Sequence, residues 1–320
     1  MGSVPERSSI RRPQPSTYPS PISEGDINGE VNRLLACSIA TNTNQTYNVG
    51  LQAFSQFRNE HGLQQVWPPP NSHINKFIAH LSLRGYKHST ASAYIAGISF
   101  HCKLHCGIDP TKQFMVQKLL QGMKRTNKHH DTRLPITIEI LNAIMHKLHL
   151  VCSNGFEEKL FKSAFSLAFY ALLRVGEMAI SKGNTIDKLI QIGDVKLQNK
   201  CIHLHIRHSK TDQLGLGTTL AIPACRSPSC PYSAMQDYLH VRPNTPGPLF
   251  CHFSGQPLTR YQFSAMLTKT LHTLGIYSTE YKSHSFRIGA ATTLAHQGYN
   301  NDIIQAAGRW HSNVYASYIR

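Results

Sequence analysis

A polar, basic stretch that ends in proline interrupts the hydrophobic pattern of this chain at residues 123–135. Its sequence, MKRTNKHHDTRLP, lacks the regular spacing of apolar residues that a buried helix or strand requires. A chain of 320 residues is also long for a single core, since domains usually contain roughly 100–200 residues. The sequence therefore predicts two domains, joined by a basic linker at residues 126–135.

The part before the linker has the periodicity of amphipathic helices. Apolar residues recur at helical spacing at Leu51, Phe54 and Phe57, and again within residues 74–98 and 114–123. Residues 1–27 are instead rich in Ser, Pro and Arg without apolar periodicity, which is typical of a disordered tail. We expect a tail at 1–27 and an all-helical domain at 28–125.

The part after the linker mixes two kinds of pattern. Residues 161–180, FKSAFSLAFYALLRVGEMAI, predict one largely apolar helix. Residues 194–223 alternate in polarity and turn through glycine-containing loops, as a meander of short strands does. Helical patterns resume after Pro231. The expected fold is mainly α with a small antiparallel β meander, in which residues 136–320 form an α+β domain.

The charge of the chain indicates a polyanionic partner. Lys and Arg number 33 against 17 Asp and Glu, which gives a net charge of +16 and an isoelectric point near 9.6. Nucleic acid is the leading candidate, because no amphipathic helix gathers Lys and Arg on one face as membrane-surface helices do. The longest apolar stretch, at 165–173, is about half the length needed to span a bilayer. We expect no membrane association.

The amino-terminal residues lack the apolar core of a secretory signal, so we expect a protein that is not secreted. Its eight cysteines are then expected to be thiols of a reducing compartment.

Two groups of His and Cys could suggest zinc. His101, Cys102, His105 and Cys106 lie within six residues, but on one apolar-periodic helix, whereas structural zinc usually takes ligands from two separated segments. Cys225 and Cys230 could recruit His240 or Cys251, yet they lack the C-x-x-C spacing. We expect core thiols and a surface histidine in the first group, and neither a metal nor a cofactor in the protein.

Several polar residues in the second part could act on a phosphate. In HSFRIGAATT, His284 and Arg287 are three residues apart, so one side of a helix would present both to an oxyanion. A tyrosine, Tyr318, stands eight residues beyond Trp310. Its hydroxyl, with an ordinary pKa of about 10, is a poor nucleophile at neutral pH, so nearby cations would have to activate it and stabilise a phosphoryl transition state. Arg174, followed by Glu177, and Lys210 in a predicted hairpin could supply such charge, although each alone is more often an ordinary surface residue.

The combination of these residues resembles the tyrosine recombinase (phage integrase-like) family over about residues 30–320. Their order is Arg174, Lys210, His284-x-x-Arg287, Trp310 and Tyr318. The boxes ALLRVGE, SKTDQLG, HSFRIGAATT and GRWHSNVYASYIR are most similar to the eukaryotic mobile-element branch of the Crypton and DIRS kind. The resemblance implies a helical core-binding (SAM-like) domain and an α+β catalytic domain that close around duplex DNA.

The resemblance also implies a role for each residue of the site. Arg174 and Arg287 would hold the non-bridging oxygens of the cleaved phosphate, as guanidinium groups suit. Lys210 would protonate the departing 5′-oxygen, and His284 would assist proton transfer from the nucleophile.

Trp310 would pack and hydrogen-bond against the phosphate, Glu177 would orient the arginine-bearing helix, and Tyr318 would form a 3′-phosphotyrosyl link. Tyr315 is the rival nucleophile, although it could equally be a packing residue.

We expect a site-specific recombinase or integrase that acts on double-stranded DNA as a homo-oligomer, a tetramer when two duplexes are joined. The alternatives are a catalytically silent DNA-binding protein derived from such an enzyme, and a nicking-closing topoisomerase. All six positions of the site are filled, which favours activity or its recent loss. If the eukaryotic resemblance holds, the protein belongs in the nucleus; otherwise it belongs in the cytoplasm. The candidate DNA-binding residues are Lys76, Arg84, Lys87, His88, Lys103, Lys124, Arg125, Lys128 and Arg133.

Overall fold

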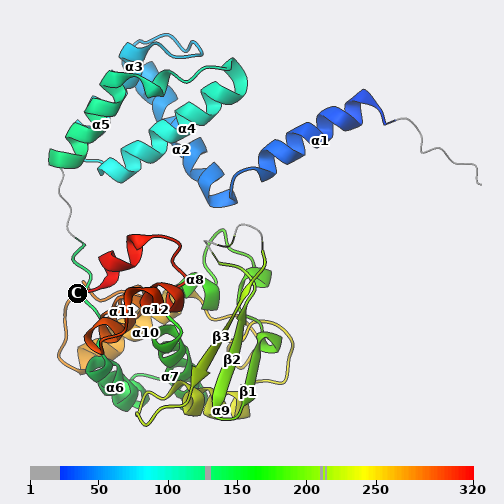
Figure 1. The fold of residues 1–320 in the computed structure, drawn as a ribbon, viewed down its shortest axis with the longest axis vertical. Coiled ribbons are helices and arrows are strands. Elements are labelled where there is room, and N and C mark those ends of the chain that lie inside the picture. The colour runs from blue at the N-terminus through cyan, green and yellow to red at the C-terminus, as the bar shows by residue number, and fades with distance from the viewer. Residues whose placement is uncertain (1–21, 127–130, 210–211, 213–214) are drawn as a thin grey trace, which may run out of the picture. The chain divides into compact units, whose positions relative to one another are not determined.

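The computed structural model describes residues 22–126, 131–209, 212 and 215–320, and the chain divides into two compact units. The first unit comprises residues 1–129 and the second comprises residues 130–320. Each unit has a hydrophobic core of its own. Figure 1 shows helices in the first unit and helices around a small sheet in the second. The predicted fold class, mainly α with a small antiparallel sheet, is confirmed.

The first unit is helical in its described residues. Its helices are α1 (Glu24–Cys37), α2 (Thr41–Glu60), α3 (Asn71–Leu83), α4 (His88–Cys106), the 3₁₀ turn η1 (Pro110–Lys112) and α5 (Phe114–Thr126). Phe54, Phe77 and Ile98, at helical spacing in the sequence, are fully buried where α2, α3 and α4 meet. The apolar periodicity therefore identified the residues that build this core.

Helix α1 starts inside the segment predicted as a disordered tail, so the boundary at residue 27 was placed too late. The side chain of Ser23 caps the helix by accepting a hydrogen bond from the backbone N–H of Asp26. Glu24 and Asp26 add negative charge to the first turn, where the helix dipole favours it. Local capping begins this helix even though Ile27 and Val31 remain exposed.

An arginine lies within the core of the first unit. Arg58 is almost fully buried, and its guanidinium carbon lies 4.4 Å from the ring centre of Phe54 and 5.0 Å from that of Trp67. It donates a hydrogen bond of 2.9 Å to the carbonyl oxygen of Val66. Burial lowers the pKa of Arg58, and the two ring faces and the carbonyl compensate the charge.

The second unit places a three-stranded sheet beside a group of helices. The strands β1 (Val195–Gln198), β2 (Cys201–Ile206) and β3 (Thr218–Pro223) are antiparallel in that order, with Leu204 opposite Val195 and Leu220. The helices and 3₁₀ turns are α6 (Ile138–Lys147), η2 (Leu148–Leu150), α7 (Gly155–Tyr170), α8 (Val175–Met178), η3 (Ile186–Lys188), η4 (Ile192–Asp194), α9 (Pro231–Val241), α10 (Arg260–Thr273), α11 (Ser285–His296), α12 (Asn301–Ala307) and η5 (Asn313–Tyr318).

Helix α7 is the centre of the second unit. Nearly every residue from Leu160 to Phe169 is buried, as expected for a helix that is covered on all sides. Figure 1 shows the sheet on one side of α7, with α6, α10 and α11 on the other.

The single helix predicted at 161–180 is in fact broken at Tyr170. Leu172 takes a left-handed conformation with φ of 45°, and the N–H of Leu173 bonds back to the carbonyl of Ala168. The chain then turns, and Arg174 becomes the cap of the short helix α8 rather than a residue within α7. The Glu177 carboxylate accepts a hydrogen bond of 2.9 Å from the Arg174 backbone N–H, which fixes this turn.

The segment that enters the second unit is bound tightly to α11. The N–H of Leu134 donates to the carbonyl of Glu280, and the N–H of Ile136 donates to that of Ser285 at 3.0 Å. A Cβ atom at Gly289 would lie only 1.8 Å from the carbonyl oxygen of Ile136. Only glycine allows this approach, so Gly289 sets how closely the segment and α11 pack.

We expect Gly289→Ala to lower the free energy of unfolding of the second unit by roughly 1–3 kcal/mol, because two backbones must separate to admit the methyl group. Urea unfolding, followed by circular dichroism, measures the change. Gly155→Ala is the control, since a Cβ at Gly155 meets nothing within 4 Å. Equal stability of the two variants would contradict the packing argument.

Candidate active site

The second unit brings five of the six predicted site residues to one place. Arg174 precedes α8, His284 and Arg287 begin α11, Trp310 follows α12, and Tyr318 ends η5. The Tyr318 ring lies 5.0 Å from the His284 ring and 4.8 Å from the Trp310 ring, between ring centres. The sixth predicted residue, Lys210, lies outside the described residues.

Arg287 lies at the bottom of this group. Its side chain is fully buried, and its two terminal nitrogens donate hydrogen bonds to the carbonyl oxygens of Leu172 and Gly308. Its guanidinium carbon lies 4.3 Å from the ring centre of Trp310 and 5.7 Å from that of Tyr318. Arg287 thus ties the turn after α7 and the end of α12 to the start of α11.

Burial, followed by the charges of Arg174 and Arg309, lowers the pKa of Arg287 to about 10. A group with this pKa is still protonated at neutral pH. Among the described residues, the Nε atom of Arg287 has no hydrogen-bond partner, which leaves a buried donor unsatisfied. The site therefore holds a permanent positive charge under the rings of Trp310 and Tyr318.

Trp310 reaches this position because the residue two before it has no side chain. A Cβ at Gly308 would lie 1.8 Å from the Trp310 ring. The indole is nearly buried and packs against Arg287. The sequence GRW thus contains a glycine that the folded-back tryptophan requires.

Glu177 lies between two arginines. Its carboxylate oxygens are 3.3 Å from Arg174 and 2.9 Å from the side chain of Arg309. Both Glu177 and Arg309 are buried, and Arg309 adopts a left-handed backbone conformation with φ of 54°. Burial lowers the pKa of Arg309, whereas Glu177 raises it. The Glu177 carboxylate therefore bonds to Arg174 at its backbone N–H as well as at its side chain, while its supporting role stays a prediction.

Arg309 is the residue that sequence reasoning missed. Its neighbour Trp310 was chosen because of its place in the GRW box, but a neighbouring arginine in a basic chain is usually exposed. No sequence pattern predicted the left-handed backbone conformation of Arg309, which turns its side chain inward to Glu177. Three arginines, Arg174, Arg287 and Arg309, consequently surround one carboxylate.

His284 is neutral in this environment. Burial, followed by the charges of Arg133 and Arg287, lowers the pKa of His284 to about 4. At neutral pH its imidazole therefore has a nitrogen that can accept a proton. The Tyr318 hydroxyl would be the proton source in the predicted chemistry, and the Tyr318 ring contacts the His284 ring.

The two candidate nucleophiles differ in their surroundings. Tyr315 is buried and belongs to the hydrophobic core, whereas Tyr318 is partly exposed and its ring contacts His284 and Trp310. The main chain of Tyr318 is held through its carbonyl, which accepts a hydrogen bond of 3.2 Å from the Thr292 hydroxyl. This geometry favours Tyr318 as the nucleophile and a packing role for Tyr315.

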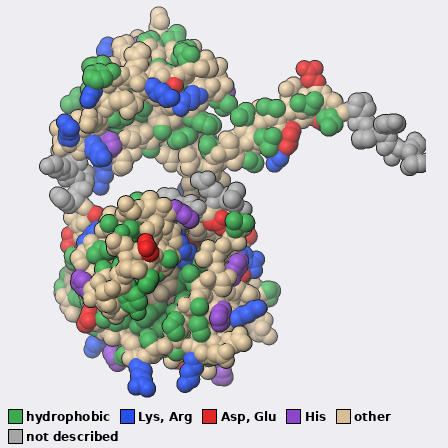
Figure 2. All heavy atoms as spheres, in the orientation of Figure 1, with side chains coloured by type: hydrophobic (Ala, Val, Ile, Leu, Met, Phe, Trp, Pro, Cys, Tyr) green, Lys and Arg blue, Asp and Glu red, His purple; other side chains and the backbone are tan. Residues whose placement is uncertain are grey.

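The predicted DNA-binding residues of the first unit lie on α3, α4 and α5 and in the turn between α3 and α4. Figure 2 shows Lys and Arg side chains spread over its surface. The exposed ones are Lys76, Arg84, Lys87, Lys103, Lys124 and Arg125, while His88 is partly buried. Lys103 pairs with Asp109 at 3.0 Å, and Arg133, in the second unit, pairs with Asp131 at 2.8 Å. Lys128 lies outside the described residues.

The His and Cys group on α4 belongs to the packing of the first unit. Cys102 is fully buried, and burial raises the pKa of its thiol to about 11. The His101 ring contacts Trp67, with 4.2 Å between ring centres, rather than pointing to Cys102. Cys225 donates its backbone N–H to the sulfur of Cys230. In the part of the chain that the structure describes, no three His, Cys, Asp or Glu residues are grouped so that they could hold a metal ion.

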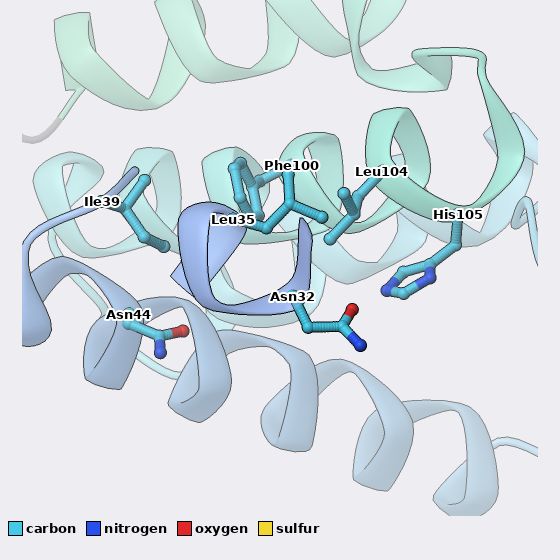
Figure 3. Close-up of a pocket in the computed structure, with 7 residues that line it drawn as sticks. All are labelled: Asn32, Leu35, Ile39, Asn44, Phe100, Leu104 and His105. Atoms are coloured by element: carbon cyan, nitrogen blue, oxygen red, sulfur yellow. The ribbon is translucent and has the colours of Figure 1, made fainter. Parts of the chain in front are cut away.

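A pocket of the first unit lies between α1, α2 and α4. It is lined by Asn32, Leu35, Ile39, Asn44, Phe100, Leu104 and His105, which Figure 3 shows as sticks. It gathers amide and apolar groups rather than the cations that phosphate chemistry requires. Among the described helices, none is both long enough and apolar enough to cross a membrane.

Comparison with known proteins agrees with this arrangement. Residues 135–318 match the phage integrase family, and residues 32–101 match the phage integrase N-terminal SAM-like domain. An integrase/recombinase xerD homolog of Selenomonas ruminantium is 26% identical over 284 residues, which cover 82% of this chain and 76% of the relative.

Solved structures share the fold at low sequence identity. The XerH site-specific recombinase, bound to its difH substrate, is 16% identical with a TM-score of 0.63, covering 86% of this chain and 75% of that one. The Tn1549 transposon integrase, in complex with circular intermediate DNA, is 17% identical with a TM-score of 0.60, covering 88% and 91%.

We expect Glu177→Gln to lower the free energy of unfolding by roughly 3–5 kcal/mol, because it leaves the buried guanidinium of Arg309 without its counter-charge. Adding Arg309→Met should recover part of that loss, since the double variant no longer buries the Arg309 guanidinium. Urea unfolding of both single variants and the double variant gives the coupling energy. Additive losses would show that the two side chains are not energetically coupled.

The lowered pKa of His284 predicts a loss of stability in acid. The unfolded chain binds a proton on this histidine below pH of about 6.5, whereas the folded protein resists protonation down to about 4. Stability should therefore fall by up to roughly 3 kcal/mol as the pH falls through this window. His284→Asn should remove this part of the slope in urea unfolding measured against pH. Parallel curves for the two proteins would mean that His284 titrates normally.

Proposed function

The chain belongs to the phage integrase family of DNA breaking-rejoining enzymes, and we propose that it is a site-specific recombinase that cuts and rejoins DNA through Tyr318. The observation that carries this proposal is the contact of the Tyr318 ring with the rings of His284 and Trp310, close to the buried cation Arg287. A partly exposed tyrosine, a neutral histidine and a fixed arginine are the groups needed for nucleophilic attack on a phosphodiester.

The proposed step begins with the Tyr318 oxygen attacking the phosphorus, while its proton passes to neutral His284. The bond from phosphorus to the 5′-oxygen breaks, and Lys210, by the family resemblance, protonates that oxygen. The product is a 3′-phosphotyrosyl link. Attack by a 5′-hydroxyl of a partner strand reverses the step and joins exchanged ends.

Charge stabilisation would come from the arginines. As negative charge grows on the non-bridging oxygens, Arg174 and Arg287 offer fixed guanidinium groups that need little reorganisation. The indole N–H of Trp310 is a further donor for the same phosphate. Glu177 and Arg309 would act through Arg174, because their ion pair fixes the turn in which Arg174 lies.

Double-stranded DNA is the proposed substrate. It is supported by the net charge of +16 and by the DNA-bound structures of XerH and the Tn1549 integrase. On this proposal the exposed cations of the first unit contact backbone phosphates, and copies of the chain assemble as a tetramer on two duplexes. The wording of the boxes supports an origin in a mobile element of the Crypton or DIRS kind, and with it residence in the nucleus.

The test is the formation of a covalent protein–DNA adduct. We expect the wild-type protein to form a 3′-linked adduct with nicked suicide duplexes, drawn from the DNA that flanks its gene, in buffer without added metal. Tyr318→Phe should abolish the adduct, and denaturing gels measure it.

Tyr315→Phe is the matched control and should retain the adduct. Loss of the adduct in Tyr315→Phe alone, with the protein still folded, would transfer the nucleophilic role to Tyr315. Salt-sensitive DNA binding without any adduct across several flanking sites would instead support the catalytically silent DNA-binding alternative.

A further inference from the structure

The carboxylate of Asp131 lies at the edge of the site and is bound by two arginines. None of these three residues has a role in the proposed catalytic step. Asp131 accepts hydrogen bonds from Arg133 at 2.8 and 2.9 Å, one to each oxygen, and its second oxygen also accepts from Arg320 at 2.9 Å. The backbone N–H of Arg133 adds a further bond of 3.2 Å. The hydrogen bonds from Arg133, together with the charge of Arg320, lower the pKa of Asp131 to about 2. The carboxylate is therefore ionised at any pH near neutrality.

This group has a fixed place beside the nucleophile. The segment that carries it is bound to the second unit through the backbone N–H groups of Leu134 and Ile136, which donate to the carbonyls of Glu280, before α11, and Ser285, its first residue. The charge of Arg133 lowers the pKa of His284, and Tyr318 is among the groups that raise the pKa of Arg133. Figure 1 shows the carboxyl end of the chain beside this same segment.

Arg320 links the group to the tyrosine through the main chain. It lies two residues after Tyr318, and its backbone N–H donates to the Thr292 hydroxyl at 3.1 Å. The same hydroxyl donates to the Tyr318 carbonyl. Thr292 therefore holds the main chain on either side of Ile319, while the Asp131 carboxylate holds only the side chain of Arg320.

The bonding pattern around Asp131 is one that a phosphodiester can reproduce. The Asp131 carboxylate has two oxygens that share one negative charge, and Arg133 binds both in a bidentate pair. The non-bridging oxygens of a DNA phosphate offer the same arrangement to an arginine. All three side chains are about one-third exposed, so solvent and DNA can reach them. Two arginines and one carboxylate also leave a net positive charge, next to a site that is itself cationic.

We propose that Arg133 and Arg320 form a second phosphate-binding site, which takes a DNA backbone phosphate near the cleaved one, and that Asp131 occupies it in the DNA-free protein. The inference rests on the proposed DNA substrate and extends it to residues outside the catalytic set. Asp131 is then a competitor for DNA: its carboxylate must leave the two guanidinium groups when the phosphate arrives. Arg133 and Arg320 are positioning residues, because their contact with DNA would fix the position of the main chain that carries Tyr318.

Binding to a mixed-sequence duplex, measured by fluorescence anisotropy over a range of salt concentrations, tests the site without requiring the recombination sequence. Arg133→Gln and Arg320→Gln should each weaken binding, and each should make the slope of log K against log salt shallower by about 0.9, the value for one lost phosphate contact. Asp131→Asn should tighten binding about two- to fivefold, the range expected when a competing surface ion pair is removed.

Glu158→Gln is the matched control for Asp131→Asn. Glu158 forms a similarly exposed pair with Lys162 on α7, and its substitution changes the net charge by the same amount. The gain from Asp131→Asn should also vanish in a protein that carries both Arg133→Gln and Arg320→Gln. If Asp131→Asn instead binds no tighter than Glu158→Gln, or keeps its gain without the two arginines, the proposal is overturned.

Adduct formation on the nicked duplexes separates this inference from the proposed function. Arg320→Gln should slow adduct formation at saturating DNA, because Tyr318 is less well placed, while Arg320→Lys, which keeps the charge, should restore part of the rate. A wild-type rate in Arg320→Gln, with the wild-type protein active, would refute the positioning role alone. Absence of any adduct with wild-type protein would count against the proposed function, whereas the salt slopes would still decide whether the phosphate site exists.

Discussion

The buried guanidinium of Arg287 is the interaction on which the second unit depends. By bonding to the carbonyls of Leu172 and Gly308, it joins the turn after α7, the start of α11 and the end of α12. The first of these lies more than a hundred residues before the other two in the sequence. The rings of Trp310 and Tyr318 then lie over the cation and shield it. An arginine in this position is expensive to desolvate, so its carbonyl and ring partners are needed for folding as well as for chemistry.

The positive charge around Arg287 creates a second constraint. Arg174 and Arg309 lie close enough to lower the pKa of Arg287, and Glu177 compensates both of them from between. Burial is the main cause of the lowered pKa that keeps His284 neutral, and the charges of Arg133, Arg287 and Arg174 act in the same direction. The site is therefore prepared for an anionic substrate before one arrives, because its cations repel one another until a phosphate enters.

The sequence predicted the parts of this structure that depend on repeated patterns. Spacing of apolar residues identified the core positions Phe54, Phe77 and Ile98, and alternation identified the three strands. It did not predict the break after Tyr170, because the left-handed turn at Leu172 has no glycine or proline to mark it. In the site, the order of motif residues indicated Arg174, His284, Arg287, Trp310 and Tyr318, whose roles remain proposals. Arg309 and Asp131 were missed because their importance depends on partners distant in sequence.

The position of Thr292 bears on which copy of this chain would supply the nucleophile in an assembly. Thr292 lies on α11, the helix that begins at His284 and Arg287, and its hydroxyl holds the carbonyl of Tyr318. One helix thus carries groups that would receive the phosphate and also tethers the proposed nucleophile. On the proposed function, each copy of the chain would then cleave DNA with its own tyrosine, in cis, and a neighbouring copy in an assembly would supply the second DNA end rather than the nucleophile.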